Sequence, residues 1–197
     1  MAKAVVFDMN GVFVEPIELP ILRRICNETR AGEWVGLSNY YLNIAQFELG
    51  YMPPKDFWKK VFPALTDEEY KEYAEAEYEK GFQRDDALYS ICSVLAKECS
   101  LYCLSNSNFM QGKAYRKQKL YSPFNGIFLS HETGRLKPFP GAYTNLLAKT
   151  GLKAGECVYV DDSWRNIAAA AALGFTAVKY TSAAALGKKL KELGLMG

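Results

Sequence analysis

The sequence predicts an α/β fold: a Rossmann-like parallel sheet with helices on both faces, plus an inserted small α-helical cap. Two observations lead to this prediction. After about residue 84, short apolar runs typical of strands alternate with helical patterns, as in a parallel sheet covered by helices. Before that point, a single strand-like run at residues 4–7 is followed by a long stretch with helical periodicity.

The first strand determines how the chain is divided. Residues 4–7 read Ala-Val-Val-Phe, an apolar run that needs neighbouring strands, and those neighbours come only in the second half of the chain. The helical block is therefore an insertion. We expect a core made of residues 1–14 and 84–197 and a cap made of residues 15–83.

Within the cap, apolar spacing predicts four helices. The second helix ends at Gly50, the pair at 53–54 (Pro-Pro) opens the third, and Thr66 with Glu69 has the spacing of a capping box that starts the fourth. We interpret the apolar and aromatic stripes of these helices as packing surfaces. Their members are Ile17, Ile21 and Ile25; Trp34, Leu37, Tyr41, Ile44 and Phe47; and Tyr70, Ala74 and Tyr78.

The core is predicted to continue with four further strands, each separated from the next by a helical segment. A final helix follows the last strand. In parallel sheets such strands are buried on both faces and read as short, nearly continuous apolar runs. The predicted strands are residues 101–104, 126–129, 157–160 and 176–180.

Composition excludes several classes of protein. Lys and Arg number 24 and Asp and Glu 22, so the net charge of +2 is too small to indicate binding to nucleic acid or to an anionic membrane. No apolar run has the length of a membrane span. The five cysteines lack zinc-type spacing, and we expect buried, reduced thiols in a cytoplasmic protein that is a monomer or a homodimer.

Polar side chains follow the predicted ends of several strands. In open parallel sheets, ligands bind beyond the carboxyl ends of the strands. A single polar residue of this kind would indicate only a helix N-cap or a turn. Several carboxylates packed at one edge of the sheet repel each other and need a compensating positive charge. The residues are Asp8, Ser105, Asn106, Lys137, Asp161 and Asp162.

A divalent cation would compensate this repulsion. Asp8, Asp161 and Asp162 supply the hard oxygen ligands that suit Mg²⁺, which retains waters and binds substrate phosphate as well. The cofactor that we expect is therefore Mg²⁺.

The other polar residues suit a phosphate. The Ser105 hydroxyl and the Asn106 backbone N–H can donate hydrogen bonds to phosphate oxygens, and Lys137 adds positive charge. Asp8 can act as a nucleophile and form an aspartyl-phosphate. The residues thus indicate phosphoryl transfer with a small phosphorylated substrate.

Four stretches of the sequence together resemble the haloacid dehalogenase-like (HAD) hydrolase superfamily, most closely its phosphatase and β-phosphoglucomutase branch. In chain order they are "VVFDMNGVF" with Asp8, "LYCLSNS" with Ser105, "GRLKPFPGAY" with Lys137 and "VYVDDSWRNIAAAAALGF" with Asp161 and Asp162. Members of this family carry a helical cap after the first of these motifs, which matches residues 15–83.

The resemblance implies roles for these residues. Asp8 would be the nucleophile and a magnesium ligand, and the backbone carbonyl of Asn10 would be another ligand. Asp162 would bind the ion directly, and Asp161 would bind it through water or orient Lys137. These roles belong to the family and are expectations for this chain.

The resemblance also concerns the entrance to the site. The segment 10–15 would be a hinge-like flap that couples cap closure to the site. Glu15, Tyr40 and Tyr41 are candidates to face the cleft, although surface or core positions are the simpler interpretation of the two tyrosines.

Asn10 departs from the family pattern. Most family phosphatases have a second aspartate there, which protonates the departing alcohol and then activates water. Asparagine keeps the shape and the backbone carbonyl but transfers no proton, and general acid–base catalysis contributes roughly 10²–10⁴-fold. The rate of hydrolysis would fall far less for a substrate whose leaving group departs without a proton.

Several hypotheses therefore remain open. The chain is a magnesium-dependent phosphatase that tolerates Asn10, or a catalytically impaired protein that binds phosphorylated ligands without turnover. An engineered Asp-to-Asn trap and deamidation of the Asn10–Gly11 pair are further interpretations. A dehalogenase or a phosphomutase is a lesser alternative, because the first needs no metal and the second depends on the aspartate that Asn10 replaces.

Overall fold

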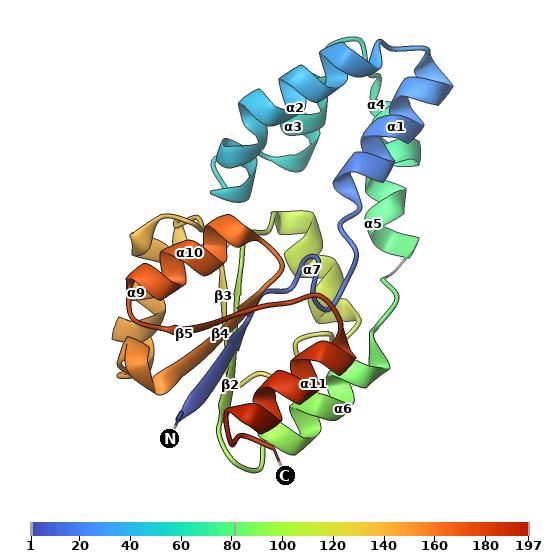
Figure 1. Cartoon of the computed structure of the whole chain (residues 1–197). Coiled ribbons are helices and arrows are strands. Elements are labelled where there is room, and N and C mark those ends of the chain that lie inside the picture. Colours follow the sequence, from blue (N-terminus) through green and yellow to red (C-terminus); the bar gives the residue numbers. More distant parts are fainter. Residues whose placement is uncertain (1, 81, 197) are drawn as a thin grey trace.

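The computed structural model describes residues 2–80 and 82–196, and within them it has a five-stranded parallel sheet in the order β3-β2-β1-β4-β5 (Figure 1). This architecture confirms the predicted Rossmann-like α/β fold, with the first strand of the chain at the centre of the sheet. The strands are β1 Ala4–Phe7, β2 Ser100–Ser105, β3 Gly126–Leu129, β4 Cys157–Asp161 and β5 Thr176–Lys179.

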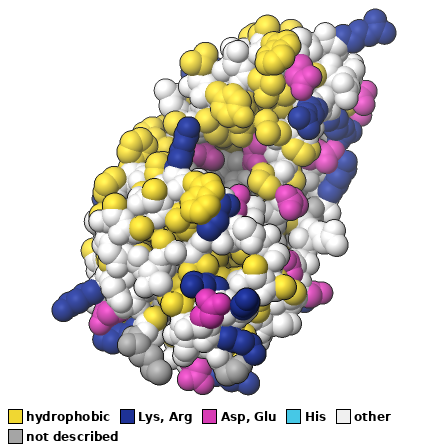
Figure 2. Space-filling model, in the orientation of Figure 1, with side chains coloured by type: hydrophobic (Ala, Val, Ile, Leu, Met, Phe, Trp, Pro, Cys, Tyr) yellow, Lys and Arg dark blue, Asp and Glu magenta, His cyan; other side chains and the backbone are white. Residues whose placement is uncertain are grey.

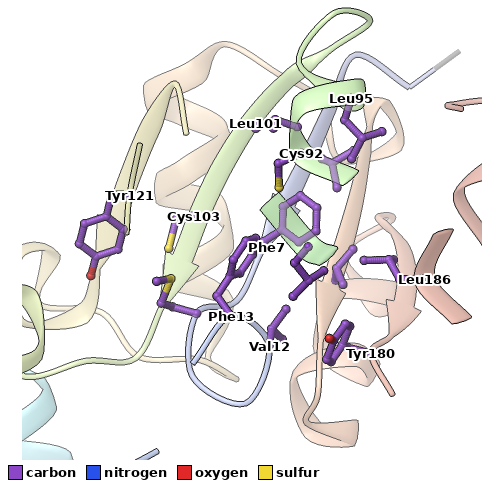
Figure 3. Close-up of a cluster of buried hydrophobic side chains, with 14 of the residues drawn as sticks. Phe7, Val12, Phe13, Cys92, Leu95, Leu101, Cys103, Tyr121, Tyr180 and Leu186 are labelled. Carbon is purple, nitrogen blue, oxygen red and sulfur yellow. The ribbon is translucent and has the colours of Figure 1, made fainter. Parts of the chain in front are cut away.

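Both faces of the sheet are covered, which explains the unbroken apolar sequence of β1. Val5 and Phe7 point into one apolar core, and Ala4 and Val6 point into the other. Figure 3 shows Phe7 packed with Phe13 and with side chains of α6. The helices against the first face are α6 Asp86–Leu95, α7 Phe109–Lys117 and α11 Ala183–Glu192, and those against the second are α9 Pro140–Thr150 and α10 Trp164–Ala172.

Between β1 and α6 the chain forms a layer of helices that lies beyond the carboxyl ends of the strands (Figure 1). This layer has its own apolar core, in which the Phe47 and Phe57 rings stack with centroids 4.1 Å apart. We call this layer the cap; its predicted bounds, residues 15–83, stay a prediction. The helices are α1 Glu18–Thr29, α2 Glu33–Glu48, α3 Pro54–Val61, α4 Asp67–Glu69, the π-helical η1 Tyr70–Glu75 and α5 Ala76–Lys80.

The helix starts in the cap follow the expected local signals. Thr66 and Glu69 form the predicted capping box, in which the Glu69 N–H donates to the Thr66 hydroxyl and the Thr66 N–H donates to the Glu69 carboxylate at 2.8 Å. The sequence predicted one helix after this box, and the structure divides it into α4, the π-helical η1 and α5.

The apolar stripe predicted for α2 is wrong in part. Phe47 is buried, but Trp34 is 85% exposed and Tyr41 is 65% exposed. At 3.6 residues per turn, these two side chains lie about two fifths of a turn from Phe47 and Gly36, the buried residues of α2. The stripe was wider than the surface that α1 and α3 cover.

Two expectations about the whole chain can be compared with the structure. In the part of the chain that the structure describes, no helix is both long and apolar enough to cross a membrane. All five cysteines are free thiols, and four are buried as expected; Cys99 is only half-buried.

Candidate active site

Three carboxylates meet at the carboxyl edge of the sheet. Asp8 follows β1, and Asp161 and Asp162 lie at and just after the end of the neighbouring β4. Each offers an oxygen, and these oxygens all lie within 4.8 Å of one another. Two segments about 150 residues apart are thus brought together by the pairing of β1 with β4.

Lys137 bridges two of these carboxylates. Its Nζ lies 2.8 Å from Asp8 Oδ1 and 2.8 Å from Asp161 Oδ2, and the residue is only 4% exposed. The loop that carries it is held by the Asn106 side chain, whose Nδ2 donates to the Lys137 carbonyl at 3.0 Å and whose Oδ1 accepts from the Lys137 N–H at 2.8 Å. Asn106, the residue after β2, therefore positions Lys137.

Asp161 is the most fully bonded of the three carboxylates. It accepts hydrogen bonds from the Tyr159 hydroxyl, from the Ser163 N–H at 2.7 Å, and from Asn166 Nδ2 at 3.0 and 3.1 Å. With Lys137 added, its oxygens have little capacity left for an ion. Asp162, whose side chain is exposed, has more.

The charges of the site are unbalanced. Burial raises the pKa of Asp8 to about 7, with Lys137 opposing the shift and Asp161 adding to it. Burial also acts against the charge of Asp161, but Lys137 and the Tyr159 hydrogen bond hold its pKa below the ordinary value. Burial and the charge of Asp161 raise the pKa of Asp162. Asp161 is thus the carboxylate that Lys137 neutralises.

This imbalance fits a divalent cation. Three carboxylates face one lysine, so two negative charges are left without a partner among these four groups. Hard carboxylate oxygens are ligands that Mg²⁺ prefers. Gly11 makes room beside them, because a Cβ there would collide with the Asp162 carboxylate and its φ of +75° favours glycine.

The remaining predicted residues lie around this cluster. Ser105 is buried at the end of β2, and its hydroxyl donates to the Asn106 carbonyl at 3.2 Å. Glu15 is exposed and lines a hollow together with Asp162. Tyr40 is half-buried against Phe57. The candidate Tyr41 is mostly exposed, as noted for α2.

Comparison with known proteins gives the family. The model of the family described as haloacid dehalogenase-like hydrolase matches residues 2–174. The chain belongs to this family of hydrolases. The matched range contains the cap helices and the residues Asp8, Ser105, Lys137, Asp161 and Asp162.

Relatives of this HAD-like hydrolase include a protein named as a phosphatase and another named as a hydrolase. It is 25% identical over 196 residues to the sesquiterpene phosphatase astK of Aspergillus oryzae, covering 97% of this chain and 96% of that protein. It is 22% identical over 151 residues to a flavin mononucleotide hydrolase of Arabidopsis thaliana. The second match covers 76% of this chain but only 61% of the Arabidopsis protein.

A solved structure has the same fold as the HAD-like hydrolase. A HAD family enzyme of Bacteroides thetaiotaomicron, in complex with magnesium and inorganic phosphate, superposes with a TM-score of 0.75. The alignment covers 92% of this chain and 95% of that one at 19% identity, which establishes similarity of fold.

Asn10 is held by the core of the HAD-like hydrolase. Its Nδ2 donates to the Asn106 carbonyl at 3.0 Å, and its Oδ1 accepts from the Tyr115 hydroxyl at 2.7 Å and from Gln111 Nε2 at 3.4 Å. Both ends of the amide are therefore used. The side chain fastens the loop after β1 to α7 through its oxygen and to the residue after β2 through its nitrogen, so the two links together need an acceptor and a donor.

Asn10→Asp is therefore expected to destabilise the magnesium-free protein in a pH-dependent way. A carboxylate oxygen would face the Asn106 carbonyl oxygen, and an unsatisfied pair of this kind costs about 1–3 kcal/mol when buried, so we expect the lower part of this range for these half-buried groups. A protonated acid could still donate to that carbonyl, so the loss should be small at pH 5 and full at pH 8. Urea unfolding of both proteins at the two pH values measures it, and an equal loss at both would contradict the assignment.

Sequence reasoning missed several residues that support the site. Tyr159 could have been found, because it lies two positions before Asp161 on the same strand and so points to the same face. Tyr115 and Gln111, which hold Asn10, gave no such signal, since they lie on a helix about 100 residues away.

Proposed function

We propose that this HAD-like hydrolase is a magnesium-dependent phosphatase that hydrolyses phosphate monoesters of small metabolites through an aspartyl-phosphate on Asp8. The observation that carries the proposal is the buried Asp8 carboxylate, which Lys137 contacts at 2.8 Å beside two further carboxylates. The names of the two relatives, a sesquiterpene phosphatase and a flavin mononucleotide hydrolase, support the reaction class but do not identify the substrate.

The chain's own groups divide the work. Lys137 holds Asp8 in place and opposes the rise in its pKa that burial causes, which favours the ionised carboxylate that attacks phosphorus. Ser105 and the backbone at Asn106 lie at the neighbouring strand end, where they would bind the phosphate oxygens. Attack forms the Asp8–phosphorus bond as the bond from phosphorus to the ester oxygen breaks, and that oxygen takes a proton from solvent to leave as the alcohol. Water then attacks phosphorus and loses a proton to solvent, the Asp8–phosphorus bond breaks, and the Asp8 carboxylate and inorganic phosphate are released.

Asp8, Asp162 and the backbone carbonyl of Asn10 are the groups that would hold Mg²⁺, with Asp161 contributing through water. When bound, the ion would neutralise the excess negative charge and polarise the phosphoryl group.

Removal of magnesium is expected to stop phosphate release. With p-nitrophenyl phosphate and a panel of phosphorylated metabolites, excess chelator should lower the rate to the buffer background, and added Mg²⁺ should restore it. The physical reason is that two uncompensated carboxylates would otherwise repel the phosphate dianion. Phosphate release that continues in chelator would overturn the proposal.

A second candidate function rests on Asn10. A protein with this site could bind phosphorylated ligands without turning them over, because the amide of Asn10 is committed to the core and carries no proton to transfer. Binding of phosphate by calorimetry together with no turnover of the panel would favour this alternative. A dehalogenase fits less well, because it would leave Asp162 as an uncompensated charge beside Asp161.

A further inference from the structure

A carboxyl group of the cap is buried against the core. Glu18 is the first residue of α1, and it is only 6% exposed. Glutamates at helix ends are usually solvated, so this burial requires an explanation. Figure 2 shows that the molecule is hollowed between the cap and the sheet domain, so the position of the cap depends on the contacts that cross from one to the other.

Glu18 joins the cap to the core through one oxygen. Its Oε1 accepts a hydrogen bond from the Tyr78 hydroxyl of α5 at 3.0 Å and another from Asn108 Nδ2 at 3.1 Å. Tyr78 belongs to the cap, whereas Asn108 is the N-cap residue of α7 in the core, and both are buried. These three side chains, which we call the cap–core link, hold α1 and α5 against the start of α7.

Hydrogen-bond donors hold the carboxylate of this link in place. Burial raises the pKa of Glu18, and the groups that oppose the rise are the backbone N–H groups of Glu18 and Ile17 and the side chains of Tyr78 and Asn108. Hydrogen bonds need both a short distance and a favourable angle. The cap–core link therefore fixes the geometry between the three helices as well as their proximity.

The core end of the link is the last residue of a segment that belongs to the candidate site. Ser105 and Asn106, the residues proposed to bind phosphate oxygens, lie three and two positions before Asn108. Asn106 also bonds both the N–H and the carbonyl of Lys137. A shift of Asn108 would therefore be transmitted over two residues to these groups.

A second route leads from the link to Asn10. Asn108 and Gln111 cap the start of α7 reciprocally: the Gln111 N–H donates to Asn108 Oδ1 at 3.1 Å, and the Asn108 N–H donates to Gln111 Oε1 at 3.1 Å. The Nε2 of the same Gln111 donates to Asn10 Oδ1 at 3.4 Å. Hydrogen bonds thus run without a break from Glu18 in the cap to Asn10 in the loop after β1.

We infer that Glu18 is a positioning residue of the proposed phosphatase: its carboxylate seats the cap on the start of α7 and thereby fixes the groups that line the active site. The inference rests on the proposed function. Glu18 takes no part in bond making, because it acts through Asn108. A misplacement of reacting groups by about 1 Å can lower a rate by about 10²-fold, so a link of this kind has a measurable effect on the rate.

The test compares Glu18→Met and Glu18→Gln with the wild type. Methionine removes the acceptor at a similar side-chain length, whereas glutamine keeps an acceptor oxygen. The rate is that of single-turnover phosphate release from p-nitrophenyl phosphate at saturating substrate and Mg²⁺, under conditions in which circular dichroism shows every protein folded. We expect Glu18→Met to lower this rate by about 10-fold or more and Glu18→Gln to lower it by less than about 3-fold.

Hydrogen exchange followed by mass spectrometry gives a readout that needs no activity. In Glu18→Met, the amides of residues 9–14 and 105–112 should exchange about fivefold faster than in the wild type, the effect of one lost hydrogen bond of average strength. The amides of β5, which the link does not reach, should be unchanged. Faster exchange confined to α1 and α5 would show that the link stabilises only the cap, and it would overturn the inference.

Tyr78→Phe removes only the donor hydroxyl on the cap side. It should show the same pattern with a smaller loss of rate, and it tests the link even if Glu18→Met does not fold. Glu28→Met is the matched control, because Glu28 is exposed near the other end of α1. It should change neither the rate nor the exchange.

The remaining outcomes separate the inference from the proposed function. An unchanged rate in folded Glu18→Met, or equal losses in Glu18→Met and Glu18→Gln, would overturn the inference. A wild type that releases no phosphate would instead overturn the proposed function, and the exchange of residues 9–14 and 105–112 would then decide by itself whether the link reaches the site.

Discussion

Asp8→Asn is expected to lower phosphate release by on the order of 10⁴-fold or more while the protein stays folded. The amide has no nucleophilic oxygen, and the loss of a covalent nucleophile typically removes nearly all of the chemical step. The measurement is single-turnover phosphate release with Mg²⁺ present, with circular dichroism to verify the fold. Turnover at the wild-type rate would remove Asp8 as the nucleophile.

The same variant has an expected effect on stability. Because burial raises the pKa of Asp8 to about 7, its contribution to stability is fully present below the unfolded carboxyl pKa and is lost as pH rises through about 7. Without Mg²⁺, Asp8→Asn should therefore unfold at the same or a higher temperature than the wild type at pH 8, with a smaller difference at pH 5. A large destabilisation at pH 8 would contradict this expectation. It would show that the ion pair with Lys137 stabilises the fold by more than the buried charge of Asp8 destabilises it.

Lys137→Met is expected to destabilise the protein by about 3–5 kcal/mol at neutral pH, the range for breaking a buried ion pair. Asp8 and Asp161 would lose the positive charge that lies 2.8 Å from each. Phosphate release should fall by about 10²–10³-fold, as when a preorganised electrostatic group is removed. Urea unfolding and single-turnover assays measure the two effects.

The Lys137 prediction also has a pH dependence. The lowered pKa of Asp161 stabilises the protein above the ordinary carboxyl pKa, and this stabilisation is lost as pH falls through the lowered value. The cost of Lys137→Met should therefore shrink in strong acid. Lys188→Met, an exposed lysine of α11, is the control and should change stability by less than about 0.5 kcal/mol. If Lys137→Met lowers the stability by no more than this control, the prediction that Lys137 is a stabilising ion bridge between Asp8 and Asp161 is wrong.

Much of the framework could be read from local patterns. All five strands occur where apolar runs predicted them, to within a residue or two at the ends, and the capping box at Thr66 and Glu69 is present. The candidate residues Asp8, Ser105 and Asp161 lie at strand ends, as expected for a parallel sheet. These features depend on a few consecutive residues, so the sequence is sufficient to predict them.

Other features depend on which surfaces meet. The pattern of α2 indicated an apolar stripe, but it did not show that α1 and α3 would leave Trp34 and Tyr41 uncovered. Likewise, nothing in the local pattern showed that Gly50 would lie against the His131 backbone or that the Ser130 hydroxyl would bond the Glu48 carbonyl, the contacts that set the end of α2 against the core.

The sequence by itself determined the α/β class, the order of the elements and the polar residues that lie at the carboxyl ends of the strands. The reason is that strand and turn preferences act over neighbouring residues. Only the tertiary structure decided that Lys137 joins Asp8 to Asp161 and that the Asn10 amide is bonded to α7. The physical reason is that such contacts join residues about 20 to 130 positions apart, and the charge state of each group follows from burial and neighbours that exist only in the folded chain.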